Sequence, residues 1–171
     1  MKILAKKEGE KWLQDHQLPQ TEDGLLNLYK NKISYTLPKD SGIKTALARS
    51  LKSFFEDSLS GKDGIFWITD WEVWPSSENQ NLFYAYRKTL KDDRTILDAP
   101  FHIFDNRDID AIECLLDLAL YFIWGVVLIF PGGKVVIRPS HNECIDVYTE
   151  SAAELMKFKE LFEHMKFPVL S

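Results

Sequence analysis

The residues of this 171-residue chain that could do acid–base chemistry gather around two of its four histidines. His141 stands in the stretch SHNEC, two residues before Glu143 and three before Cys144. A histidine that titrates near neutral pH, placed beside a carboxylate, is the usual pair for general acid–base catalysis. His102 is the second histidine of interest, and Asp105 follows it as another carboxylate. We therefore take His102, His141 and Glu143 as the catalytic candidates.

Several established chemistries lack a required part in this sequence. The His-x-Glu step of zinc deaminases occurs at His141, but the Pro-Cys-x-x-Cys ligand pair that this chemistry needs is missing. His102, Cys114, His141 and Cys144 are ligand types that zinc accepts, yet no pair of them has finger-like spacing. The sequence also contains no G-x-S-x-G, P-loop or G-x-G-x-x-G motif. We expect no metal and no cofactor, and the sequence leans away from an enzyme.

Aromatic residues are densest between residues 65 and 87, where Trp67, Trp71 and Trp74 fall within eight residues. Each aromatic side chain buries roughly 150–250 Å², so such a cluster forms either the centre of a core or a binding surface. Trp71 and Trp74 flank Glu72, which predicts a surface that combines aromatic and acidic groups. Core packing remains the alternative for most of these rings.

A second candidate surface is acidic. Asp110, Glu113 and Asp117 recur at intervals of three and four, which places them on one face of a helix. The net charge is −5, and the whole negative excess lies in residues 101–171. This balance argues against broad nucleic-acid affinity. The stripe is either the solvent side of the helix or a docking ridge for a basic protein.

Hydrophobic periodicity and turn signals place the elements that must position these groups. In residues 41–59 the spacing predicts a helix that is opened by Asp40 or Ser41 and has Lys44, Arg49 and Lys52 on its polar face. Gly125 is the expected stop of the long apolar helix, and PGGK at 131–134 is the expected turn of a hairpin. Helices are expected at about 8–18, 41–59, 77–90, 107–124 and 150–166, and strands at about 33–37, 65–74, 101–104, 126–130, 135–138 and 144–148.

Mixed elements without strict alternation, ending in an antiparallel meander, predict an α+β fold: a mostly antiparallel sheet packed by helices. We expect one domain over residues 1–171, with a peripheral N-terminal helix within residues 1–24. Two cysteines and the lack of a secretory leader favour the cytoplasm. The apolar run 115–130 is shorter than the ~20 residues of a membrane span, so we expect no membrane partner.

Three stretches resemble a family of small bacterial proteins of uncharacterised function. They are WPSSEN at 74–79, APFH at 99–102 and SHNE at 140–143, where Asn142 departs from the aspartate of the family pattern. The resemblance covers about residues 40–150, and it singles out Trp74, Ser76, Ser77, Glu78, Asn79, His102, His141 and Glu143. Some small acidic bacterial proteins are immunity proteins that neutralise nuclease toxins, which is an analogy only. Capping of a helix by Ser76 or Ser77 is the structural alternative for WPSSEN.

The leading hypothesis is a cytoplasmic protein-binding module, immunity-like in neutralising a basic toxin. Its expected binding residues are Trp71, Glu72, Trp74, Ser77, Glu78, Asn79, Asp110, Glu113 and Asp117. The alternative is a small hydrolase or nucleotide-processing enzyme, which requires His102, His141 and Glu143 to converge in one cleft. A third possibility is a ligand-sensing module with an aromatic-lined pocket. The oligomeric state stays open.

Overall fold

A computed structural model of the protein describes residues 1–58, 63–70, 77–130 and 132–169, with the side chains of 57–58 and 77–80 left out of the description. Within these residues the chain forms one antiparallel sheet with the strand order β1-β4-β3-β5-β6-β7-β2. The strands are β1 Lys2–Leu4, β2 Asn31–Thr36, β3 Gly64–Asp70, β4 Phe101–Phe104, β5 Gly125–Ile129, β6 Val135–Ser140 and β7 Cys144–Thr149.

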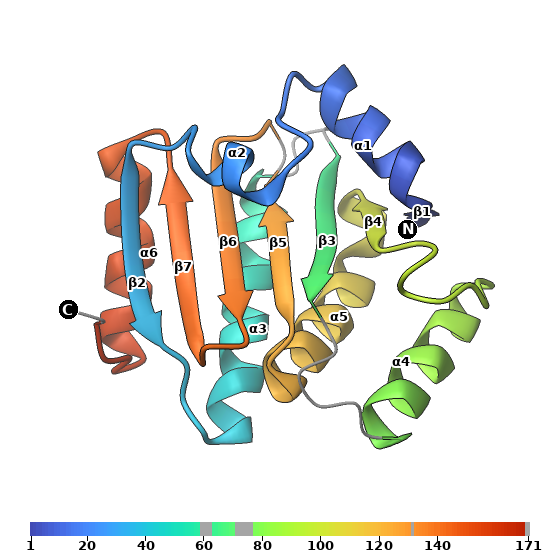
Figure 1. The fold of residues 1–171 in the computed structure, drawn as a ribbon. Helices are drawn as coiled ribbons and strands as arrows, with labels where there is room; N and C mark the ends of the chain where they lie inside the picture. Colours follow the sequence, from blue (N-terminus) through green and yellow to red (C-terminus); the bar gives the residue numbers. More distant parts are fainter. Residues whose placement is uncertain (59–62, 71–76, 131, 170–171) are drawn as a thin grey trace.

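Helices cover both faces of this sheet (Figure 1). The helices α3, α5 and α6 lie behind it in this view, and α1 and α2 lie in front. The bounds are α1 Lys6–Asp15, α2 Glu22–Leu26, α3 Ser41–Ser58, α4 Ser77–Thr89, α5 Ile109–Phe122 and α6 Ala152–His164, with a 3₁₀ turn at Asn106–Asp108 before α5. The predicted α+β class is confirmed.

Two hydrophobic cores sit on the two faces because successive side chains of a strand point to opposite sides. On β3, Phe66 and Ile68 face the larger core under α3, α5 and α6, whereas Ile65 and Trp67 face the smaller core under α1 and α2. The central strands are therefore apolar on both sides.

Local signals explain several boundaries. Asp40 begins α3 as expected, because its Oδ1 accepts a hydrogen bond from the Ile43 N–H at 3.0 Å. The β5–β6 hairpin is confirmed as well. Its glycines, Gly132 and Gly133, adopt φ values of 81° and 70°, a region that residues with a side chain rarely enter. The apolar run 115–130 divides between α5 and β5, and no helix in the described part of the chain is long and apolar enough to cross a membrane.

The structure differs from the sequence-based expectations at four places. The edge strand β1 and the short helix α2 were not predicted; the first is three residues long and the second five, too short for a periodic pattern to emerge. The helix α5 ends at Phe122, its C-cap Ile123 takes a left-handed φ of 58°, and the expected stop Gly125 instead begins β5. Lys44 is buried although its position on the polar face of α3 predicted exposure.

Candidate functional site

A cleft of about 480 Å³ opens on the α1/α2 face of the sheet, above the end of β3. Its size falls within the ~300–1,000 Å³ of typical ligand sites. Trp67, Ile96, Leu97 and Pro100 give it an apolar side. Opposite them stands a polar rim from α1 and the start of α2, formed by Lys6, Glu10, Gln20, Thr21 and Glu22.

The aromatic floor depends on a close approach of α1 to β4. The Trp67 ring stacks on Phe101 with centroids 4.9 Å apart. Gly9 of α1 packs against the same Phe101 ring. A Cβ at this position would lie 2.2 Å from Cδ2 of Phe101 and would overlap the ring. The lack of a side chain at Gly9 therefore allows α1 to close the smaller core and to bring Lys6 and Glu10 to the rim of the cleft.

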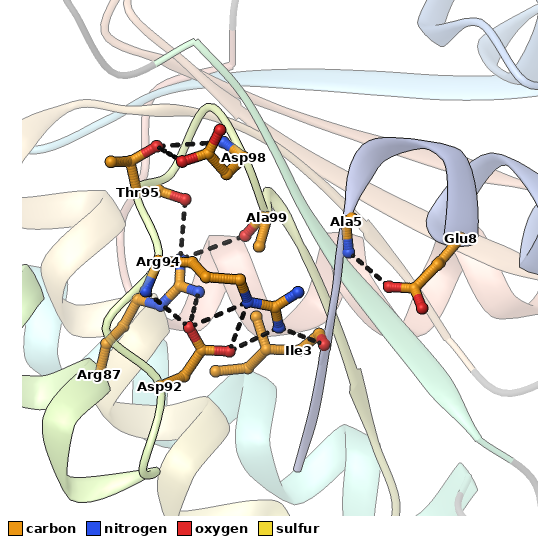
Figure 2. A network of polar contacts seen from close by, with 9 residues as sticks. All are labelled: Ile3, Ala5, Glu8, Arg87, Asp92, Arg94, Thr95, Asp98 and Ala99. Atoms are coloured by element: carbon orange, nitrogen blue, oxygen red, sulfur yellow. Dashed lines mark hydrogen bonds and ion pairs between the residues drawn. The ribbon is translucent and has the colours of Figure 1, made fainter.

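The apolar wall belongs to the segment between α4 and β4, which a cluster of arginines holds in place (Figure 2). Arg87 is fully buried, and its Nη2 donates to Asp92 Oδ1 at 2.8 Å. Its Nη1 donates to the backbone carbonyls of Thr95 at 3.4 Å and Ala99 at 3.2 Å. A charged group buried in this way is tolerated only when it is paired and hydrogen-bonded. The wall that carries Ile96 and Leu97 is thus tied to α4.

Asp92 joins Arg87 to a second arginine. Arg94 Nη2 donates to Asp92 Oδ2 at 2.6 Å and to the carbonyl of Ile3, on β1, at 2.8 Å. The hydrogen bonds from Arg94, together with the charge of Arg87, lower the pKa of the Asp92 carboxyl to about 2. The Asp92 carboxylate therefore stays charged at neutral pH and holds both arginine side chains in place by charge-assisted hydrogen bonds.

The polar rim is attached to the sheet through Glu22. Glu22 pairs with Nε of Arg138 on β6. Arg138 Nη1 also lies 3.6 Å from Asp146 Oδ2 on β7, and the nearly buried Asp146 accepts a hydrogen bond from Ser34 Oγ at 2.5 Å. This network fixes the start of α2 to the sheet. Both walls of the cleft are therefore anchored by arginine–carboxylate contacts.

These features make the cleft the candidate binding site of the described structure. It offers a stacked aromatic floor, an exposed Leu97 and charged groups at its rim, the combination found where proteins hold an apolar group and orient it with a few polar contacts. Its described lining residues include no histidine and no cysteine.

The structure places the three catalytic candidates apart. His102 lies on β4, fully buried, with its ring edge-on to Phe66 and Phe83. Burial and the nearby positive charge of Arg87 lower its pKa to about 3. His141 lies in the β6–β7 turn, and β3 and β5 separate β4 from β6. Three strand spacings amount to about 14 Å, well beyond hydrogen-bond reach.

His141 and Glu143 have separate neighbours. His141 Nδ1 lies 3.3 Å from Asp70 Oδ2 at the end of β3. Glu143 is exposed, takes a φ of 55°, and borders a small cavity of about 180 Å³ beside Lys44. The contact with Asp70 could be anticipated only from the strand order, since 71 residues separate the two positions.

The acidic stripe of α5 packs beside the basic side of α3. Lys52 Nζ lies 2.6 Å from Asp110 Oδ1 and 3.1 Å from Glu113 Oε2. Arg49 Nε lies 3.3 Å from Glu113 Oε1. Two of the three acids therefore have basic partners within the chain, and Asp117 is the member of the stripe without such a pair among the described residues.

The other predicted binding residues are placed in part. Trp71, Glu72 and Trp74 lie outside the described residues, as does Ser76. Ser77, Glu78 and Asn79 form the first turn of α4, and their side chains lie outside the description. Within the described parts of the chain, no group of three or more His, Cys, Asp or Glu side chains is arranged to hold a metal ion.

Compared with known proteins, the chain matches no family model, no curated protein and no solved structure. Trp67 belongs to the tryptophan cluster of the sequence but was not among the expected binding residues, and neither were Leu97, Glu22 and Arg138. The one available signal was the arginine and the two aspartates in KDDR at 91–94, which resembles an ordinary solvated loop.

Proposed function

We propose that the protein is a binding module that recognises a segment of another protein through the cleft over Trp67. One observation carries the proposal: the cleft joins a stacked aromatic floor to a large exposed apolar wall residue, Leu97, which is 66% exposed. Aromatic anchors surrounded by contacts that exclude water dominate the energy of protein interfaces. Such a surface suits an aliphatic or aromatic side chain that a partner inserts.

The charges around the cleft favour a basic partner segment. Glu10, Glu22 and Lys6 stand at the rim among the described lining residues, and because Glu22 already pairs with Arg138, Glu10 is the carboxylate that a basic partner would meet. The chain as a whole carries a net charge of −5. Complementary charge raises the rate of association and disfavours wrong partners. A lysine or arginine beside the anchor of the partner would meet the rim.

The cellular role that we infer is neutralisation of a basic protein, in the manner of an immunity protein. The free thiols of Cys114 and Cys144 support a reducing compartment, and we infer a cytoplasmic location. The hydrolase alternative has less support, because His102 is buried in the sheet and two strands separate it from the turn that carries His141 and Glu143.

The test is selection of random displayed peptides on the immobilised protein, followed by titration of the selected peptides by fluorescence anisotropy. We expect sequences in which an aromatic or aliphatic residue adjoins lysine or arginine. Leu97→Glu should weaken their binding by about tenfold or more, because a charged group would replace the apolar wall. Glu10→Gln should reduce the salt dependence of binding.

The matched control is Met156→Glu, which introduces the same group at another exposed apolar residue, on α6. This variant should bind the selected peptides like the wild-type protein, and circular dichroism should show both variants folded. Equal binding by Leu97→Glu and the wild type, or a selection that yields no enriched peptide, would contradict the proposal.

A further inference from the structure

A hollow of about 300 Å³ lies at the C-terminal end of α1, where the segment after α2, the β5–β6 hairpin and the end of β7 come together at the upper edge of the sheet in Figure 1. Two partly buried aromatic residues, Trp12 and Tyr29, and one carboxylate, Glu150, line it. We name it the Trp12 pocket; the other described lining residues are His16, Gln17, Leu18, Leu28, Gly132 and Gly133. None of these residues lines the Trp67 cleft, so the two sites are separate.

Stacking, hydrogen bonding and core packing hold the two aromatic rings of the pocket. The Trp12 ring stacks on the His16 ring with centroids 3.8 Å apart. The Tyr29 hydroxyl donates to the Gly133 carbonyl at 2.6 Å, which ties the segment after α2 to the hairpin. Both aromatic residues also pack against the smaller core. Because these rings are already ordered, little side-chain freedom is lost when a ligand binds against them.

Glu150 supplies the negative charge of the pocket. Its backbone is held at two points, since its N–H donates to the Lys134 carbonyl at 3.2 Å and its carbonyl accepts from Asn31 Nδ2 at 3.1 Å. Burial raises the pKa of Tyr29 and the charge of Glu150 raises it further, so the carboxylate lies near the phenol. No basic side chain of the described residues lies within 4 Å of this carboxylate. It is therefore open to a cation that a ligand brings.

The polar groups of the wall favour a cation that has no N–H groups. The Gly133 carbonyl already accepts from Tyr29, and the Trp12 carbonyl already accepts from the His16 N–H at 3.1 Å. Lysine and arginine side chains carry several N–H donors, each of which needs an acceptor once water is removed. A trimethylammonium group needs none, and its charge is attracted to aromatic rings and to a carboxylate.

We propose that the Trp12 pocket binds a trimethylammonium group, with its methyl groups against the rings of Trp12 and Tyr29 and its charge opposite Glu150. The volume is at the lower end of the ~300–1,000 Å³ range of ligand sites, which suits such a head group and excludes a large cofactor. The same group occurs on small molecules such as choline and on trimethylated lysine side chains. The experiment distinguishes these two sources.

The experiment is isothermal titration calorimetry of the wild-type protein with choline and with Nε-trimethyl-lysine whose termini are blocked. We expect at least one of the two to bind with a Kd below about 1 mM. Tighter binding of choline assigns the pocket to a small molecule, and tighter binding of trimethyl-lysine assigns it to a modified protein chain. Failure of both probes to bind would overturn the proposal.

Each probe has a matched analogue. In 3,3-dimethyl-1-butanol a carbon replaces the charged nitrogen of choline, and blocked lysine lacks the methyl groups of trimethyl-lysine. Each analogue should bind about tenfold or more weakly than the probe that it matches. If the butanol bound as well as choline, the pocket would recognise shape and not charge. If lysine bound as well as trimethyl-lysine, the preference for a cation without N–H groups would be wrong.

Variants separate the site from the fold. Glu150→Gln keeps the shape of an exposed side chain and removes its charge, so it should weaken binding of the probe about tenfold or more. Its matched control is Glu160→Gln, at an exposed glutamate of α6, which should bind like the wild type. Trp12→Leu should abolish binding, whereas Trp12→Phe, which keeps a ring, should retain part of it. Thermal unfolding without ligand identifies any variant that fails to fold. A folded Glu150→Gln protein with wild-type affinity would refute the role of Glu150, and equal binding by Trp12→Leu and the wild type would refute that of the ring.

Discussion

The ring of His102 sits between Phe66 and Phe83 in the interior of the protein, close to the positive charge of Arg87. A histidine that must be neutral when folded but can be protonated when unfolded couples protonation to unfolding. Since its pKa is lowered to about 3, the folded state binds fewer protons than the unfolded state between pH ~6.5 and 3. At this position the histidine contributes a pH dependence of stability.

We predict that the free energy of unfolding falls as pH drops through this window, with His102 contributing up to about 1.4 kcal/mol per pH unit. His102→Leu should remove that share, so the variant should lose less stability than the wild type between pH 7 and 4. Urea unfolding at several pH values measures the free energy of unfolding of the variant and of the wild type. His164→Leu, at an exposed histidine, is the control. Identical pH profiles for His102→Leu and the wild type would contradict the prediction.

Gly9 provides a second prediction at the level of one residue. Alanine normally stabilises a helix by about 1 kcal/mol relative to glycine. At Gly9 the added methyl group would overlap Phe101, so we expect Gly9→Ala to destabilise the protein by about 1–3 kcal/mol. Chemical denaturation measures the change. The smaller variant Phe101→Leu should tolerate alanine at position 9 better than the wild type does, and equal costs in both backgrounds would argue against this contact.

Between single residues and the fold, the arginine cluster determines where the segment from α4 to β4 lies. Asp92→Ala would leave Arg87 buried without its carboxylate partner, and we predict a loss of about 3–5 kcal/mol in the free energy of unfolding. Arg94→Gln removes a partner that is 40% exposed and should cost only about 1 kcal/mol or less. Urea denaturation compares the two. Similar losses would mean that Asp92 acts through Arg94 and not through Arg87.

The elements that sequence analysis located are those in which local patterns and tertiary packing agree. The helix α3 carries apolar residues at three and four and an aspartate cap, so its position could be predicted within a residue. The strand β1 could not be predicted, because three residues give no periodicity and its pairing with β4 joins positions about 100 residues apart. Ile123 ends α5 in a left-handed conformation that a β-branched residue seldom adopts, so glycine was the reasonable expectation.

The candidate site was less predictable than the fold for the same reason. Trp67 was visible as part of an aromatic cluster, but its neighbours Leu97 and Glu22 come from distant segments whose approach depends on the sheet order. The prediction for the polar face of α3 was wrong at Lys44, because helical periodicity assigns this residue to solvent whereas the folded chain buries it. Burial of a single charged residue is a tertiary property.

At the scale of the whole molecule, one sheet supplies a face to each of two cores. The central strands β3 and β5 contribute Phe66 and Leu128 to the larger core and Ile65 and Val127 to the smaller one. Neither helical layer has an apolar partner other than this sheet within the described structure. If one core is lost, the strands β3 and β5 lose the packing on one face, and the same strands carry the residues of the other core. The two cores should therefore unfold together.

We therefore predict that the protein unfolds in one cooperative transition. Leu13→Ala in the smaller core and Leu116→Ala in the larger core both truncate fully buried leucines, and each should cost about 2–5 kcal/mol. Hydrogen exchange followed by mass spectrometry measures the opening of α1 and α5 separately. Because the sheet is shared, Leu13→Ala should lower the opening free energy of the slowest amides in α5 as much as in α1. If Leu13→Ala loosened α1 alone, the smaller core would be a separate unit, and the Trp67 cleft could open without unfolding the sheet.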